Sequence, residues 1–335
     1  MNTYIDITPF PTANTQQQRI IKKLEKELGP TIMSALNDPN VTDINVNPDG
    51  NVWIERLDIS DITKIAVLTP QARESIIKTV ATSLNEVANK NSSTIGGELP
   101  LLGARFEGVL PPVAKPGPGF SIRKKATRIL TFKDYLNDKI LDFAMITLLQ
   151  DSIENYDNVL IAGGTGTGKT TFINAYVDQT SKQFPHDRLV ICEDVDEIQS
   201  NAPNTFKMIS NRNNPLGSCI KTMLRLSPKR IIIGEIREAD QAREAFQAWN
   251  TGHKGGVFSL HANSALDAIQ RLEDLCQIAF NNKCQRLISR TVDKIIFFKK
   301  AGNKRKIQEF YSLQAFSKGT YNLTDLINNQ EVKFL

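Results

Sequence analysis

The opening of the chain has the hydrophobic period of a helix. Residues 16–36 place apolar side chains on one side and basic side chains around the remainder, and the apolar positions include Ile20, Ile21, Leu24 and Leu28. A basic amphipathic helix could lie on an anionic membrane surface, or its apolar stripe could pack on the domain that follows. Because Glu25 and Glu27 dilute the positive charge on which membrane binding depends, packing is the favoured interpretation.

Strand patterns dominate the next hundred residues. Pro48 and Gly50 favour a tight turn between the first two of these strands, which predicts a hairpin. A helix is expected to begin at Pro70, with Thr69 as its cap, and to run on with apolar residues at helical spacing. The first half therefore predicts a small α+β domain. Its expected strands are residues 43–46, 52–57, 62–68, 104–110 and 120–123.

Apolar strands alternate with helical patterns in the second half. That alternation predicts a parallel sheet covered by helices on both faces, an α/β fold. The expected strands are residues 158–162, 188–193, 231–234 and 256–260, with helices starting near residues 169, 216, 238 and 264. Residues 294–298 and 306–313 then predict a two-stranded ribbon. Its basic turn, residues 299–306, is interpreted as a solvated turn.

Length and composition fit this division into two domains. A chain of 335 residues with 40% apolar and 23% charged residues is typical of a globular protein of about two domains, which excludes a disordered chain or a rod. We expect an N-terminal domain over residues 1–125 and a second domain over residues 126–335, connected near residues 124–135. The longest apolar runs are far shorter than the ~20 residues of a spanning helix, and no secretory signal opens the chain, so a cytoplasmic location is expected.

The cysteines and the net charge argue against a metal-binding and a nucleic-acid-binding protein. Cys192, Cys219, Cys276 and Cys284 show no paired metal-ligand spacing, so they are interpreted as reduced, mostly packed thiols, and no metal cage is expected. A net charge of +5 is slight for this length, so nucleic acid is not expected as a direct ligand.

A phosphate-binding loop is the sharpest chemical signal. Residues 163–170 match G-x-x-x-x-G-K-[ST] between an apolar strand and a helix. Glycines allow successive backbone N–H groups and the helix N-terminus to face phosphate. Lys169 should bridge the β- and γ-phosphates of ATP, and the Thr170 hydroxyl should ligate Mg²⁺. The expected nucleotide contacts are Gly163, Gly164, Thr165, Gly166, Thr167, Gly168, Lys169, Thr170 and Thr171, together with Arg237 and His253.

Two acidic strand ends could serve hydrolysis. Glu235 ends an apolar strand and is the candidate to orient the attacking water. Gly234 stands where many P-loop enzymes carry a metal-binding Asp. Glu193, at the end of another strand, could support the metal or the nucleophile, whereas Asp196 and Glu197 are interpreted as solvated residues.

Two histidines flank the strand that follows the Glu235 segment. His253 and His261 are candidates for the same site, because the carboxyl ends of parallel strands are where α/β sheets bind ligands. His186, beside Pro185, is interpreted as a surface residue.

The combination of these segments resembles a known family. The glycine loop, the acidic box at 191–197, the strand at 233–237 and the stretch from 248 to 263 are similar to those of the traffic ATPases of type II and type IV secretion. The likeness is closest to the TrbB-type ATPases of conjugative transfer and covers about residues 20–315. The lack of an Asp before Glu235 is also a feature of that family.

The resemblance implies a hexamer of two-domain subunits, with a RecA-like second domain and ATP bound between the domains. It implies Mg²⁺ as cofactor, other subunits of a secretion or conjugation machine as partners, and peripheral attachment to the cytoplasmic face of the inner membrane. It assigns Glu235 as the catalytic glutamate, Glu193 to the acidic box and His253 and His261 to the histidine box. Arg105 and Arg123 match segments whose arginines reach the γ-phosphate; the alternative is a charged strand edge.

Three functions remain open at this point. The main hypothesis is a hexameric ATP-hydrolysing motor for a secretion or conjugation apparatus, with a motor for pilus extension or retraction as a close variant. The basic stretches at 123–128 and 299–306 motivate a RecA-like nucleic-acid translocase. A nucleotide-gated structural subunit that binds ATP without hydrolysing it is the third.

Overall fold

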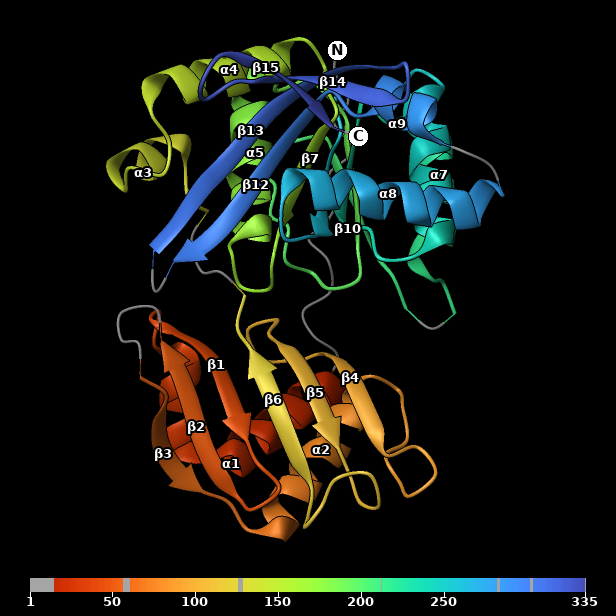
Figure 1. Cartoon of the computed structure of the whole chain (residues 1–335). Coiled ribbons are helices and arrows are strands. Elements are labelled where there is room, and N and C mark those ends of the chain that lie inside the picture. The colour runs from red at the N-terminus through yellow and green to blue at the C-terminus, as the bar shows by residue number, and fades with distance from the viewer. Residues whose placement is uncertain are drawn as a thin grey trace, which may run out of the picture. The chain divides into compact units, whose positions relative to one another are not determined.

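The chain forms two compact units, residues 1–127 and 128–335 (Figure 1). The computed structural model describes residues 15–56, 61–125, 129–211, 213–281, 284–301 and 304–334. Residue 57, which ends a predicted strand, and residues 126–128, which end a basic stretch, lie outside the described residues.

The first unit is a helix-backed antiparallel sheet, as the α+β prediction requires. Its strands lie in the order β3-β2-β1-β6-β5-β4, and every neighbouring pair is antiparallel. Helices α1 and α2 cover one face of this sheet (Figure 1). The elements are α1 Thr15–Asn37, β1 Val41–Val46, β2 Asn51–Arg56, β3 Thr63–Val67, α2 Pro70–Ser83, β4 Thr94–Glu98, β5 Arg105–Val109 and β6 Gly119–Arg123.

The apolar stripe of α1 packs inside this unit. Leu24, Leu28 and Ile32 are buried in the core that lies between the sheet and its helices. Gly29 interrupts the helix with φ 71°, and Pro30 follows it at the start of the next turn. The stripe is therefore used for packing, which is the interpretation that the sequence favoured.

A buried arginine fixes the loops before the last strand of the first unit. The Arg73 side chain of α2 donates from Nε to the Pro118 carbonyl (2.7 Å) and from Nη2 to the Pro48 carbonyl (2.9 Å), and it also bonds the Leu68 carbonyl. Because carbonyl acceptors satisfy all three nitrogens, the burial of this charge is compensated. The hairpin turn and the loop before β6 are thereby held to α2.

The second unit is a mixed sheet with a parallel centre. Strand order is β15-β14-β13-β12-β7-β11-β10-β8-β9; neighbours are parallel from β12 to β9 and antiparallel from β12 to β15. The four predicted central strands and the four predicted helix starts are confirmed to within a residue or two. The elements are α3 Phe132–Asn137, α4 Phe143–Glu154, β7 Val159–Gly163, α5 Lys169–Gln183, β8 Leu189–Glu193, β9 Thr205–Ile209, α6 Leu216–Met223, β10 Arg230–Glu235, α7 Ala239–Asn250, β11 Val257–His261, α8 Ala265–Phe280, α9 Gln285–Thr291, β12 Lys294–Ala301, β13 Lys304–Ser317, β14 Thr320–Asp325 and β15 Gln330–Phe334.

Each central strand sends alternate side chains into two separate cores. Leu160 of β7 lies in the core formed with α6 to α9, whereas its neighbour Ile161 lies in the core formed with α3 to α5. Burial on both faces explains why these strands read as continuous apolar runs in the sequence. The four cysteines are buried in this unit and form no disulfide among the described residues.

Four strands bring chemical groups to one edge of the sheet. The parallel strands β7, β8, β10 and β11 end in Gly163, Glu193, Glu235 and His261. Since the carboxyl ends of parallel strands share an edge, these four residues converge there. Within the described segments, every helix is too short or too polar to cross a membrane.

Candidate nucleotide-binding site

The glycine loop has a backbone that only glycine fits at its two ends. Gly163 has φ 157°, and a Cβ there would lie 2.7 Å from both the Phe298 carbonyl oxygen and the Thr167 hydroxyl. Gly168 has φ 96°. The Thr167 hydroxyl donates to the Gly164 carbonyl at 2.9 Å and closes the loop on itself. The glycines at 163 and 168 are therefore required by conformation and space.

Helix α5 begins where the loop ends. Its cap residue is Gly168, which provides no side-chain acceptor for the first turn of N–H groups. An anion placed before Lys169 would meet these N–H groups and the positive end of the helix dipole. Thr170 and Thr171 lie in the same first turn, so their hydroxyls belong to this end of the helix.

Lys169 folds back onto the loop. Its Nζ donates to the Gly163 carbonyl at 2.9 Å and to the Gly164 carbonyl at 3.1 Å, and it lies 4.0 Å from Glu235 Oε1. Burial lowers the pKa of the Lys169 ammonium, and the Glu235 carboxylate partly opposes that shift. A phosphate group would give this cation the counter-charge that burial otherwise denies it.

Glu235 is oriented by a neighbouring arginine. Arg237 donates to Glu235 Oε2 from Nε (2.8 Å) and from Nη2 (2.5 Å), and its Nη1 lies 3.6 Å from Asp194 Oδ2. Both donors address one oxygen, so Oε1 remains directed toward the Lys169 side. Arg237 thus lies beside the loop as a positioning group for Glu235.

Glu193 is buried and held by backbone donors. Its carboxylate, with the residue 3% exposed, accepts from the Ile198 N–H at 3.0 Å and the Glu197 N–H at 3.1 Å, and it lies 2.8 Å from Lys207 Nζ. Burial raises the pKa of the Glu193 carboxyl, whereas the Lys207 ammonium lowers it. Asp196 also pairs with Lys207. Asp196 and the N–H of Glu197 therefore belong to this anchored loop, and both residues remain partly exposed to solvent.

The geometry explains the glycine before Glu235. A Cβ on Gly234 would lie 2.7 Å from Glu193 Cβ, because the two residues are neighbours on adjacent strands. An aspartate at position 234 would collide with Glu193 and add a second negative charge beside it. Glu193 therefore occupies the space that an aspartate side chain at 234 would need.

The two histidines lie at opposite edges of the sheet. His261 ends β11 and is the register partner of Gly163, so it lies beside the glycine loop. His253 precedes β11 and lies at the amino end of that strand. The expectation of a nucleotide contact for His253 in this unit is thus corrected, because residues that flank one strand lie a strand length apart.

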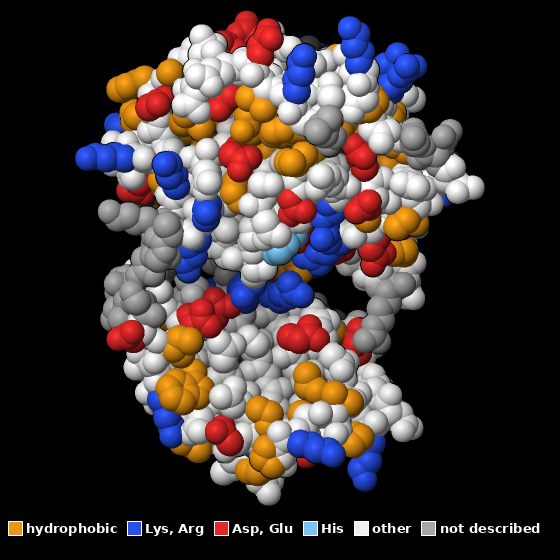
Figure 2. Space-filling model, viewed as in Figure 1, with side chains coloured by type: hydrophobic (Ala, Val, Ile, Leu, Met, Phe, Trp, Pro, Cys, Tyr) orange, Lys and Arg blue, Asp and Glu red, His pale blue; other side chains and the backbone are white. Residues whose placement is uncertain are grey.

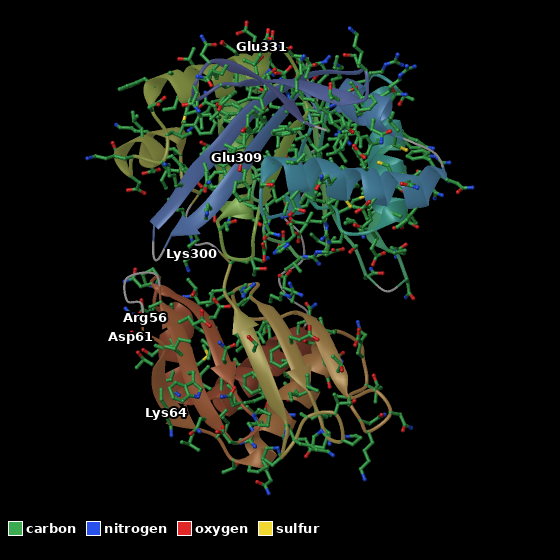
Figure 3. All side chains as sticks on the ribbon, viewed as in Figure 1. Arg56, Asp61, Lys64, Lys300, Glu309 and Glu331 are labelled. Atoms are coloured by element: carbon green, nitrogen blue, oxygen red, sulfur yellow. The ribbon has the colours of Figure 1, made fainter. Side chains whose placement is uncertain are left out.

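Arg305 is a site residue that the sequence analysis missed. A Cβ on Gly168 would lie 3.0 Å from Arg305 Cδ and 3.3 Å from its Nε, so this side chain lies against the cap of α5. The ribbon formed by β12 and β13 carries it there; Figure 3 labels Lys300 near the end of β12 and Glu309 farther along β13. Glu309 accepts from the Ala265 N–H at 2.9 Å and so ties the ribbon to α8.

Arg105 and Arg123 lie side by side in the first unit. They are register partners on β5 and β6, and the row continues to Asp43 on β1 and Glu98 on β4. Arg123 Nε lies 2.7 Å from Asp43 Oδ1. This row lies on the face that the helices leave uncovered, where Figure 2 shows hydrophobic, acidic and basic side chains interspersed. The structure brings the two arginines together.

The residues at the loop suit a magnesium ion held mainly by phosphate. Among the described residues no group of three His, Cys, Asp or Glu side chains forms a metal cage. Mg²⁺ commonly keeps several waters and takes only one or two protein ligands beside substrate phosphates. The Thr170 hydroxyl, in the first turn of α5, and the Glu235 carboxylate fit that donor set, directly or through water.

Comparison with known proteins agrees with this geometry. Residues 108–311 match the family model described as type II/IV secretion system protein. A conjugal transfer protein TrbB from Rhizobium radiobacter is 38% identical over 303 residues, which are 90% of this chain and 93% of the relative.

Solved structures share the fold at low sequence identity. The pilus retraction motor PilT with bound ADP matches with a TM-score of 0.62 at 17% identity, covering 86% of this chain and 83% of that chain. The Legionella pneumophila ATPase DotB matches with a TM-score of 0.58 at 18% identity, covering 92% and 84%. With the glycine loop and its carboxylates in place, the chain belongs to the type II/IV secretion system protein family and is an ATPase of that family, with a RecA-like second unit.

Proposed function

We propose that this protein is a hexameric, ATP-hydrolysing motor of a type IV secretion or conjugation apparatus. The observation that carries the proposal is the convergence of Lys169, the uncapped start of α5 and Glu235 at one edge of the sheet. The likeness to a conjugal transfer protein over nine-tenths of the chain favours conjugation over the pilus motor as the process served.

The residues have separate roles in the hydrolysis of Mg²⁺–ATP. Lys169 and the N–H groups of α5 compensate the β- and γ-phosphate charge. Glu235 orients a water and accepts its proton as the water oxygen bonds to the γ-phosphorus; the bond from that phosphorus to the β–γ bridging oxygen breaks and ADP leaves. Thr170 would hold Mg²⁺, which neutralises charge on the transferred phosphoryl group. His261 lies at the same edge of the sheet and is the last of the residues that we assign to the catalytic site.

Arg105 and Arg123 supply the γ-phosphate sensor in this proposal. The γ-phosphate is lost in each cycle, so a paired guanidinium group that contacts it can both stabilise the developing charge and register its departure. The alternative, a charged strand edge, is compatible with the Asp43 contact of Arg123. The effect of replacing each arginine on ATP and ADP affinity distinguishes a γ-phosphate sensor from a charged strand edge.

The proposed cellular location is supported by the likeness to conjugal transfer proteins. We infer that the hexamer lies on the cytoplasmic face of the inner membrane and acts with other subunits of the machine. Because the stripe of α1 is buried, any membrane attachment of α1 would use other surfaces. Arg305 lies against the cap of α5, which favours a role with nucleotide over a role of the basic ribbon turn with nucleic acid.

Light scattering tests the assembly. A purified sample with Mg²⁺ and a slowly hydrolysed ATP analogue should give a mass near six times 37.4 kDa. A strict monomer at high concentration would contradict the motor. Single-stranded DNA should leave the ATPase rate unchanged; a marked, salt-sensitive stimulation would favour the translocase.

A further inference from the structure

The second unit has a pocket at the edge opposite the glycine loop. The pocket is open to solvent and has a volume of about 610 Å³, and we call it the amino-edge pocket. Six residues define it here: Tyr156, Lys229, Trp249, His253, Lys254 and Arg290. They come from the segments before β7, β10 and β11 and from the last turn of α9, before β12. Because these four strands are parallel neighbours, their amino ends form one edge, a full strand length from the site of hydrolysis.

The lining of the amino-edge pocket is cationic. It includes Lys229, Lys254 and Arg290, and none of its lining residues is an Asp or a Glu. Lys254 Nζ lies 3.8 Å from Asp293 Oδ1, so one of the three charges has a carboxylate neighbour. The remaining excess is about two positive charges, the charge that a phosphate monoester would neutralise.

Nitrogens behind the wall of the pocket lack hydrogen-bond partners. Trp249 is 2% exposed, and within the described part of the chain its indole Nε1 has no hydrogen-bond partner; the same holds for Nδ1 of His253. Behind Tyr156, Arg230 donates from Nε to Asp187 at 2.7 Å, and its guanidinium lies 3.9 Å from the centre of the Tyr156 ring. Because these nitrogens are buried, the groups that a ligand can contact are the exposed cations Lys229, Lys254 and Arg290.

A purely structural explanation accounts for part of this arrangement. Cations near the carboxyl ends of α7 and α9 would stabilise the helix dipoles. That explanation does not account for a concave volume in the range of small-ligand sites, roughly 300–1,000 Å³.

We propose that the amino-edge pocket binds a phosphate-bearing ligand. Lys229, Lys254 and Arg290 provide the counter-charges, and the Tyr156 and Trp249 rings form an apolar wall. The phosphate group could belong to a soluble phosphorylated compound or to a lipid headgroup. Binding here would be separate from ATP hydrolysis at the glycine loop.

Tryptophan fluorescence tests the proposal in the whole chain. The protein has two tryptophans, so Trp53→Phe leaves Trp249 as the only reporter. Lys169→Ala in the same chain removes the phosphate contact at the glycine loop, which keeps this test independent of the proposed ATPase. Titration with inorganic pyrophosphate should then shift Trp249 emission to saturation. Lys229→Ala or Arg290→Ala should raise the midpoint about tenfold or more, the scale of one charged hydrogen bond.

Matched variants decide between the outcomes. Arg286→Ala removes an exposed cation one turn earlier on α9, outside the pocket lining, and should leave the midpoint unchanged. Lys229→Arg keeps the charge and checks that lost binding is not lost folding. If pyrophosphate gives no signal, vesicles containing phosphatidylglycerol should sediment the protein, and Lys229→Ala and Arg290→Ala should abolish that effect; this result supports the headgroup source. The proposal is overturned if neither probe responds, or if the pocket variants respond as Arg286→Ala does.

Discussion

The substitution Glu235→Gln should separate ATP binding from ATP hydrolysis. Arg237 places both of its hydrogen bonds on Oε2 of Glu235, so the amide oxygen of glutamine can accept both donors and keep the side chain in place. What the variant loses is the negative charge and the basic oxygen, Oε1, that faces Lys169. The local structure around Glu235 should therefore be retained.

The substitution should leave ATP affinity unchanged or higher and should lower the rate of turnover. At 4.0 Å the Lys169–Glu235 attraction is about 4 kcal/mol at an effective dielectric of ~20, and the 22% exposure of Glu235 reduces it. That attraction competes with phosphate for Lys169, so its removal should leave ATP affinity unchanged or tighter by up to about tenfold. Loss of a positioned general base should lower steady-state phosphate release by roughly 10²- to 10⁴-fold.

Two assays on one preparation measure these quantities. Equilibrium titration with a fluorescent ATP analogue gives the dissociation constant, and phosphate release under saturating Mg²⁺–ATP gives kcat. Glu154→Gln, an exposed carboxylate at the end of α4, is the matched control and should change neither. If Glu235→Gln instead loses ATP binding together with hydrolysis, the main role of Glu235 is to hold the metal or the local structure, and its role as base is refuted.

Four other substitutions probe the remaining parts of the site. Arg105→Ala or Arg123→Ala should slow phosphate release by about 10³-fold or more and leave ADP affinity unchanged, because ADP has no γ-phosphate; equal losses for ATP and ADP would identify destabilisation of the first unit. Gly234→Asp should lower the urea midpoint, at a cost of about 1–3 kcal/mol or more for overpacking against the neighbouring carboxylate side chain, and a wild-type midpoint would disprove that steric account. Arg305→Ala should weaken ATP and ADP binding about tenfold, whereas Lys300→Ala on the same ribbon should not; the same affinity in both variants would exclude a nucleotide role for Arg305.

The parts that the sequence predicted well are those with local signals. The strand-loop-helix around Lys169 combines an apolar run, fixed glycines and a helix start, and each is visible within a few residues. Glu193 and Glu235 were found because they end buried strands, and parallel strands end at one edge. Doubly buried strands and amphipathic helices predicted the architecture of the second unit, and shorter strand patterns beside amphipathic helices predicted that of the first.

The parts that were missed depend on pairing in space. Arg305 reaches Gly168 only because β12 lies beside β7 in the sheet, and nothing in the residues around 305 indicates that neighbour. Arg105 and Arg123 were both candidates from the sequence, but their adjacency depends on the register of β5 and β6. Glycine is needed at position 234 because the Cβ of Glu193, on a different strand, leaves no room for a side chain there.

Weak local propensity accounts for β4, a strand that was not predicted. It contains Gly96 and Gly97, which disfavour a strand interior, so tertiary pairing with β5 decides its conformation. His253 was misplaced for another reason. Its nearness to His261 in sequence conceals that β11 runs between them, from one edge of the sheet to the other.

The central claim is that the glycine loop hydrolyses ATP, and phosphate release by the purified protein tests it most directly. Wild-type protein with Mg²⁺ and ATP should release phosphate steadily over many turnovers, and Lys169→Ala should bind ATP weakly and release none, because the β- and γ-charges lose their only lysine partner in the loop. Release at an unchanged rate by Lys169→Ala would contradict the assignment of the site, and the absence of release by wild-type hexamer would contradict the motor.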